Sequence, residues 1–172
     1  VEFRGKSQRQ MRGQPAKTGI VRFSSPELMV PRLGGTTRDE VLAELTDRLE
    51  AEGFVVNGDE IYEEALNREA IVSTAVDHSL AFPHVRGVEG GGLIMALGMS
   101  KKGIKFDESV RTLTRMVFFM VIPTAASAFY LKLLAGLTQA FREKEIRDAL
   151  LAETTSEGMW KALVESTRST VS

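Results

Sequence analysis

Apolar residues recur at helical spacing in the first part of the chain. Thr37–Glu40 has the Thr-x-x-Glu pattern of a capping box, and Gly53 supplies a stop. Four apolar positions lie between them at helical spacing: Val41, Leu42, Leu45 and Leu49. This pattern predicts an amphipathic helix. A second, shorter helix is predicted from about Asp59 to Glu69.

Two apolar runs in the middle of the chain predict buried strands. The first is Leu93–Met99, which follows a glycine-rich turn at Gly90–Gly92, and the second is Arg115–Ile122. Three further helices are predicted after these strands: Ala126–Phe141, Glu143–Leu151 and Ser156–Val164. Helices before and after apolar strands are typical of an α/β fold, in which helices cover a mixed sheet.

The composition of the chain limits the classes of protein to which it can belong. A chain of 172 residues with 43% hydrophobic and 26% charged side chains is typical of one globular domain. The absence of cysteine excludes disulfide scaffolds, thiolate zinc sites and cysteine nucleophiles. The apolar stretch Met116–Leu137 is interrupted by Pro123, so it is too short for a membrane span. We expect no membrane insertion and a cytoplasmic location.

The net charge of −1 conceals a basic N-terminal arm. Residues 1–22 hold six Lys or Arg against Glu2, so the rest of the chain carries about −6. We predict that residues 1–22 are a disordered leader or an expression remnant, and that residues 23–172 form one domain. Binding of nucleic acid through the arm is an alternative hypothesis that rests on charge alone, so we expect no nucleic-acid partner.

Both histidines of the chain, His78 and His84, lie in a stretch of small residues at 71–86. Pro83 directly precedes His84 and restricts the backbone, which predicts a loop that leads into a short strand. A neutral imidazole is nucleophilic near pH 7 and can be oriented through its second nitrogen. These properties suit transfer of a phosphoryl group.

Three residues that precede both histidines in the sequence are candidates for contacts with phosphoryl oxygens. Arg68 offers a guanidinium, and Ser73 and Thr74 offer hydroxyl donors. The ordinary alternative is a surface histidine with Arg68 and Glu69 as a solvated ion pair at a helix end.

Other kinds of site have little support in the sequence. A metal site at His78 and His84 lacks a third ligand. The Gly90–Gly92 run lacks the Lys-Ser/Thr of a nucleotide loop, so it predicts a turn. We expect neither a metal nor a cofactor.

Together, these residues form a more specific pattern. The motifs are Asn67–Glu69, Ser73-Thr74 and Ala81–His84, followed by Gly98–Phe106 and Leu131–Leu134. Their order resembles the signature of the enzyme IIA domains of the fructose, mannitol and nitrogen-regulatory class in the bacterial phosphotransferase system, over most of residues 23–165. The resemblance implies a mixed, roughly five-stranded sheet sandwiched by helices.

The resemblance also implies a role for each motif. His84 would accept a phosphoryl group from the carrier HPr or a homologue, with Arg68 and Thr74 at the site. Glu69, Ser73, His78 and Tyr130 are candidates for supporting positions. The next partner would be a IIB permease domain or a regulated protein, so the output would be sugar transport or nitrogen regulation.

The chain departs from the family pattern at two places. Ala75, Asp77 and Ser79 stand where glycines are usual, and Tyr130 stands where members often have a second histidine. An acidic Asp77 that points inward would disfavour an incoming phosphoryl group. These departures motivate an alternative hypothesis, a transfer-impaired regulatory or binding module of the same fold, as part of a larger transporter.

Overall fold

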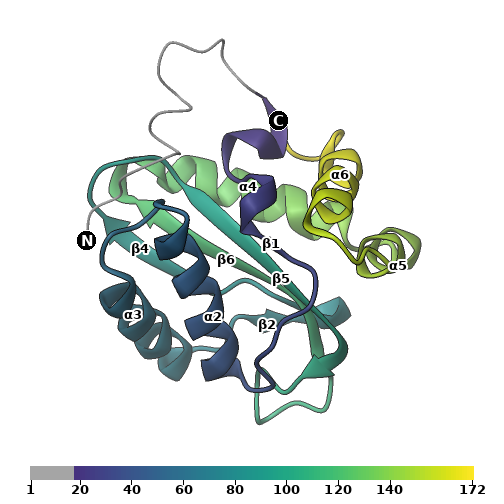
Figure 1. Cartoon of the computed structure of the whole chain (residues 1–172), viewed down its shortest axis with the longest axis horizontal. Helices are drawn as coiled ribbons and strands as arrows, with labels where there is room; N and C mark the ends of the chain where they lie inside the picture. The colour runs from purple at the N-terminus through teal and green to yellow at the C-terminus, as the bar shows by residue number, and fades with distance from the viewer. Residues whose placement is uncertain (1–17) are drawn as a thin grey trace.

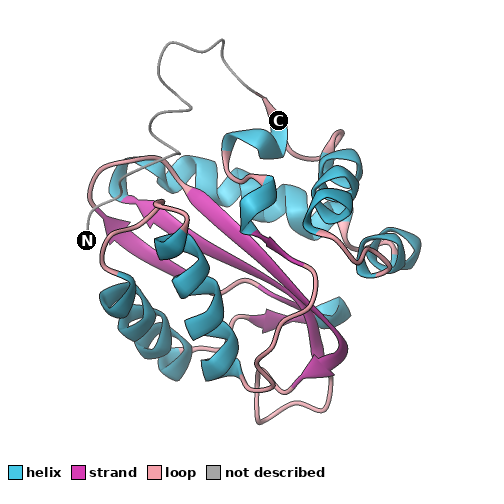
Figure 2. Cartoon of the chain, viewed as in Figure 1, coloured by secondary structure: helices cyan, strands magenta, loops and turns pink. Residues whose placement is uncertain are grey.

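The computed structural model describes residues 18–172 (Figure 1). This part of the chain forms a six-stranded mixed sheet and five α-helices (Figure 2). The prediction of a mixed sheet between helices is confirmed, with six strands where roughly five were expected.

Two long antiparallel strands form the centre of the sheet. They are β5 (Ile94–Ile104) and β6 (Thr114–Pro123). β1 (Met29–Val30) pairs with β5 in parallel. Almost every residue of β6 is buried, because helices cover both faces of the sheet. Burial on both faces explains why the sequence of β6 is a continuous apolar run and not an alternating pattern.

The other long edge of β6 carries two short strands in line, both parallel to it. These are β3 (Leu80–Ala81) and β4 (His84–Val88). β3 also pairs with β2 (Ala75–Val76) in an antiparallel hairpin. Phe82 and Pro83 separate β3 from β4, and Pro83 has no N–H to donate to the sheet. The segment before His84, which was predicted as a loop, therefore contains two strands of two residues each, β2 and β3. His84 is the first residue of β4.

The helices form two groups. α2 (Arg38–Ala51) and α3 (Gly58–Ile71) pack on one face of the sheet, and α4 (Ser127–Ala140) lies on the other (Figure 1). α5 (Lys144–Leu151) and α6 (Ser156–Thr167) follow, and α6 contacts α4 and β1. These helices confirm all five predicted ones.

The capping box predicted for the first helix is present. Thr37 Oγ1 accepts from the backbone N–H of Glu40 at 3.2 Å, and Glu40 Oε1 accepts from the N–H of Thr37 at 3.2 Å. These bonds satisfy two N–H groups that the helix itself leaves unpaired.

Some sheet boundaries differ from the prediction. β5 continues past Met99 to Ile104, because pairing with β6 resumes at Ile104 opposite Thr114 after an irregularity in the ladder that contains the exposed Lys101 and Lys102. Of the predicted leader, residues 1–17 lie outside the described residues, whereas Gly19–Arg22 form the short 3-10 helix η1 against α6.

None of the helices within residues 18–172 is long and apolar enough to cross a membrane.

The position of α4 depends on a close approach to the C-terminal segment. A Cβ added at Gly136 would lie 2.5 Å from the carbonyl oxygen of Thr170 and 2.7 Å from Val171. We therefore predict that Gly136→Ala lowers the free energy of unfolding by about 1–2 kcal/mol, since the overpacking exceeds the gain in helix propensity. Urea denaturation measures it, with the exposed Ala135→Ser as the control. A Gly136→Ala protein more stable than the parent would contradict the prediction.

Candidate functional site

The backbone around Pro83 holds the ring of His84 in one orientation. The N–H of Phe82 donates to the carbonyl oxygen of Thr74 at 3.1 Å, and the carbonyl oxygen of Pro83 accepts from Met120 N–H at 3.0 Å. The carbonyl oxygen of Phe82 lies 3.0 Å from Nδ1 of His84. A carbonyl oxygen can only accept, so Nδ1 carries the proton and Nε2 keeps its lone pair.

The surroundings of His84 favour its neutral form. The side chain is buried, and burial lowers the pKa of His84 below its ordinary value, although the hydrogen bond to Phe82 acts in the opposite direction. The positive charges of Arg68 and Arg86 lower this pKa further. The imidazole is therefore uncharged and nucleophilic near pH 7.

Tyr130, which the sequence analysis named as a candidate for a supporting position, lies beside His84. It belongs to the first turn of α4, and its ring centroid is 5.3 Å from that of His84 at an interplanar angle of 38°. Burial raises the pKa of Tyr130, so the side chain is a neutral phenol. The ring of Tyr130 packs against one side of the His84 imidazole and adds no charge to the site.

Arg68 and Glu69 lie together in the last turn of α3 but differ in their surroundings. Arg68 is exposed, and its charge acts on His84. Glu69 is buried, and its Oε1 accepts from the backbone N–H of Thr74 at 3.1 Å. The carboxylate thus holds the segment that leads to β2. The surface ion pair of Arg68 with Glu69, which was the ordinary alternative, is not among the ion pairs of residues 18–172.

The two predicted hydroxyls have different environments. Ser73 Oγ accepts from the N–H of Ala75 at 3.2 Å and so helps to fix the turn. Thr74 Oγ1 and Glu69 Oε2 are buried without a hydrogen-bond partner within the described residues. The Thr74 hydroxyl nevertheless lies close enough to the Glu69 carboxyl to lower the pKa of Glu69, and it is a donor that a bound group can use.

His78 does not join His84. It is exposed in the short 3-10 helix η3 (Asp77–Ser79), and the ring contacts found within residues 18–172 do not include it. His78 and Ser79 have φ of +67° and +64°, a left-handed conformation that glycine adopts without strain. Asp77 is exposed, and the charged groups that shift the pKa of His84 are the two arginines.

Arg86 is a site residue that the sequence reasoning missed. Its Cζ lies 5.4 Å from the centroid of the Tyr130 ring. The available signal was its place two residues after His84 in an expected strand, since alternate residues of a strand share a face.

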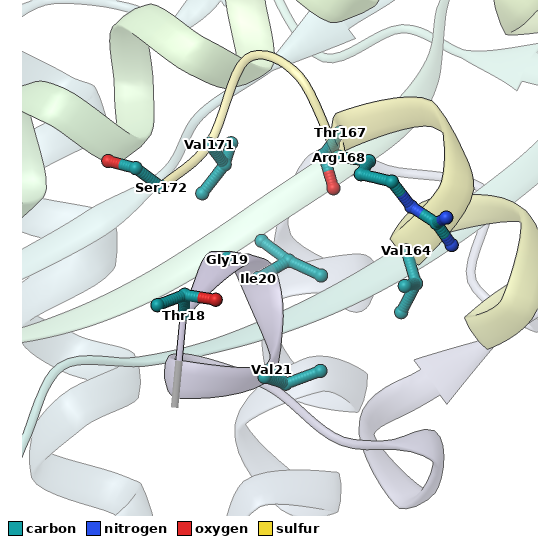
Figure 3. Close-up of a pocket in the computed structure, with 9 residues that line it drawn as sticks. All are labelled: Thr18, Gly19, Ile20, Val21, Val164, Thr167, Arg168, Val171 and Ser172. Carbon is teal, nitrogen blue, oxygen red and sulfur yellow. The ribbon is translucent and has the colours of Figure 1, made fainter. Parts of the chain in front are cut away.

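Residues 18–172 contain a pocket that lies away from the predicted site, and they contain no cluster of side chains suited to a metal ion. Within residues 18–172 no three His, Asp or Glu side chains are grouped so that they could hold a metal ion. A pocket of about 410 Å³ lies between η1 and the C-terminal end of α6, and none of the predicted site residues lines it (Figure 3). Its lining comprises Thr18, Gly19, Ile20, Val21, Val164, Thr167, Arg168, Val171 and Ser172.

Comparison with known proteins identifies the family. Residues 23–166 match the family described as "Phosphoenolpyruvate-dependent sugar phosphotransferase system, EIIA 2". The chain belongs to this family. It is thus a phosphotransferase-system component, and membership favours a phosphoryl relay over the transfer-impaired module.

Relatives include both a free-standing and a multi-domain protein. The nitrogen regulatory protein of Bradyrhizobium diazoefficiens is 26% identical over 144 residues, which are 84% of this chain and 94% of the relative. The 2-O-alpha-mannosyl-D-glycerate-specific EIIABC component of Escherichia coli strain K12 is 26% identical over 130 residues. That alignment covers 74% of this chain but only 20% of the relative, so the chain spans about a fifth of that protein.

A solved structure supports the fold independently. The nitrogen regulatory protein IIA-Ntr of Neisseria meningitidis superposes with a TM-score of 0.74 at 20% sequence identity. The superposition covers 84% of this chain and 98% of that chain. The EIIA 2 fold therefore extends over nearly all of the described domain.

The buried carboxylate of Glu69 makes stability depend on pH. Burial raises the pKa of Glu69, opposed in part by the Thr74 hydrogen bond and by Arg38 and Arg68. The folded protein therefore retains this proton to higher pH than the unfolded chain, and stability falls as pH rises above about 4.5 through the folded pKa.

Glu69→Gln keeps an acceptor for Thr74 but removes the charge. We predict that its free energy of unfolding, relative to the parent, increases as pH rises over this window. Glu69→Ala leaves the Thr74 N–H unpaired and costs about 1–3 kcal/mol. Denaturant unfolding between pH 4 and pH 8 measures both effects. Parallel profiles for the parent and the Gln variant would show that Glu69 titrates normally.

Proposed function

We propose that this chain accepts a phosphoryl group on Nε2 of His84 from the phosphohistidine of HPr or a homologue, and then passes it on. One observation carries the proposal: Nδ1 of His84 is bound to the carbonyl oxygen of Phe82 at 3.0 Å, which leaves Nε2 as the nucleophile. A buried, neutral imidazole fixed in this way is suited to repeated gain and loss of a phosphoryl group.

The transfer step needs no proton from solvent. The Nε2 lone pair of His84 forms a bond to phosphorus while the nitrogen–phosphorus bond of the donor breaks. The electron pair of that bond returns to the donor imidazole, which keeps the proton on its other ring nitrogen and so leaves as a neutral ring. The proton on Nδ1 stays in its hydrogen bond to Phe82, and this bond strengthens as the ring becomes positively charged.

Groups around His84 can accommodate the phosphoryl oxygens. The guanidinium of Arg68 supplies positive charge, and the unpartnered hydroxyl of Thr74 supplies a donor. Glu69 and Ser73 act indirectly, because they hold the backbone on either side of Thr74. Tyr130 covers the ring of His84. His78 has no part in this proposal.

The acceptor differs between relatives. The name of the mannosylglycerate relative joins EIIA with EIIB and EIIC, which favours a IIB domain as the next phosphoryl acceptor. The name of the Bradyrhizobium relative favours a regulated protein. Either output starts from phosphoenolpyruvate, a metabolite of the cytoplasm, so we place the domain there.

Phosphorylation by purified components tests the proposal. After incubation with phosphoenolpyruvate, enzyme I and HPr, we expect the mass of the chain to increase by one phosphoryl group. His84→Gln should abolish the increase, because the other histidine of the sequence, His78, is exposed in η3 and the described residues present no other nucleophile in the same way. His78→Gln, a change of the same type at the exposed histidine, is the matched control and should leave the increase intact.

Two results would overturn the proposal. One is a parent protein that gains no phosphoryl group while a known IIA domain in the same mixture does. The other is a gain that persists in His84→Gln, which would place the phosphoryl group on another residue. Circular dichroism of each variant confirms that the fold is retained.

A further inference from the structure

Arg86 belongs to neither the predicted site nor the proposed function, yet it lies next to His84. Both residues are on β4, two positions apart, and alternate residues of a strand point to the same face. Arg86 is exposed while His84 is buried. A long side chain at this position rises from the strand beside the imidazole and reaches solvent above it.

The ring of Tyr130 is in contact with both residues. Its centroid is 5.3 Å from the centroid of the His84 ring and 5.4 Å from Cζ of Arg86. A guanidinium within about 6 Å of an aromatic centroid is attracted by the ring. Tyr130 is itself buried at the start of α4, so it offers the guanidinium a fixed surface beside the imidazole.

The guanidinium of Arg86 forms no ion pair with a carboxylate of the described residues. In the part of the chain that the structure describes, neither Arg86 nor Arg68 takes part in an ion pair. Both charges are close enough to His84 to lower its pKa. Two uncompensated guanidiniums beside one neutral nucleophile are unfavourable to each other, and an arriving dianion relieves that repulsion.

We propose that Arg86 binds oxygens of the phosphoryl group carried on His84, and that the Tyr130 ring holds its guanidinium in place for this contact. The inference rests on the proposed function and deepens it. Arg86 approaches from β4 and Arg68 from α3, two elements that contact each other, so the phosphoryl group is held between two arginines.

Arg86→Gln tests the proposal in two assays. One uses phospho-HPr as the donor, and the other uses phosphoramidate, a small donor that needs no protein contact. We expect phosphorylation to slow roughly tenfold to a hundredfold in both, the loss expected for one charge-assisted hydrogen bond. Arg142→Gln is the matched control. It lies twelve residues beyond Tyr130, just past the other end of α4, about 18 Å away along the helix.

A second readout separates the proposed role from a structural one. Titration of His84 by NMR should show a higher pKa in Arg86→Gln than in the parent and in Arg142→Gln, because a positive charge beside the ring is lost. In a double-mutant cycle, Tyr130→Leu should slow phosphorylation in the parent and add little in Arg86→Gln.

The outcomes distinguish this inference from the proposed function. If the parent is not phosphorylated, both fail. If the parent is phosphorylated and Arg86→Gln matches it with both donors, only the inference on Arg86 fails. A loss confined to phospho-HPr would assign Arg86 to contact with the donor protein and overturn the inference. So would slower transfer without a rise in the His84 pKa.

Discussion

The carbonyl oxygen of Phe82 lies 3.0 Å from Nδ1 of His84, and the chemistry of the site depends on this contact. Because a carbonyl cannot donate, the contact determines which ring nitrogen carries the proton and which one faces the reaction. Burial then keeps the ring neutral, and Tyr130 restricts its rotation. Without the Phe82 contact, the tautomer and the direction of the free nitrogen would no longer be defined.

The fold produces this contact through an interruption in one sheet edge. β3 and β4 both pair in parallel with β6, and Phe82 and Pro83 lie in the gap between them. Since the gap is not a regular ladder, the Phe82 carbonyl is available to a side chain. α3 then brings Arg68 to the site, and α4, which follows β6 after the short 3-10 helix Thr124–Ala126, brings Tyr130. Residues distant in sequence meet because β6 lies beside β4.

Local signals explain which parts of the fold could be predicted from sequence. The capping box of α2 and the apolar run of β6 are contained within short windows, so they were recognisable. β1, β2 and β3 have two residues each, too few for any periodicity, and only pairing with distant strands defines them. The extension of β5 likewise depends on its partner.

The site residues also divide into those that the local sequence marks and those that only the fold brings together. Proximity in sequence grouped His78 with His84, but the β2–β3 hairpin leaves His78 exposed in η3. Tyr130 was expected only through a family resemblance, since nothing local marks it as a neighbour of His84. Arg86 carries no motif, and its role emerges only when β4 and α4 are placed together.

The ring nitrogen that carries the phosphoryl group is the most direct test of the central claim. Long-range proton–nitrogen correlation NMR on the phosphorylated, nitrogen-15-labelled protein identifies that atom. We predict a phosphoryl group on Nε2 of His84, with the proton on Nδ1 still in its hydrogen bond to Phe82. A phosphoryl group on Nδ1 would contradict the claim, because it requires that the contact with Phe82 be broken.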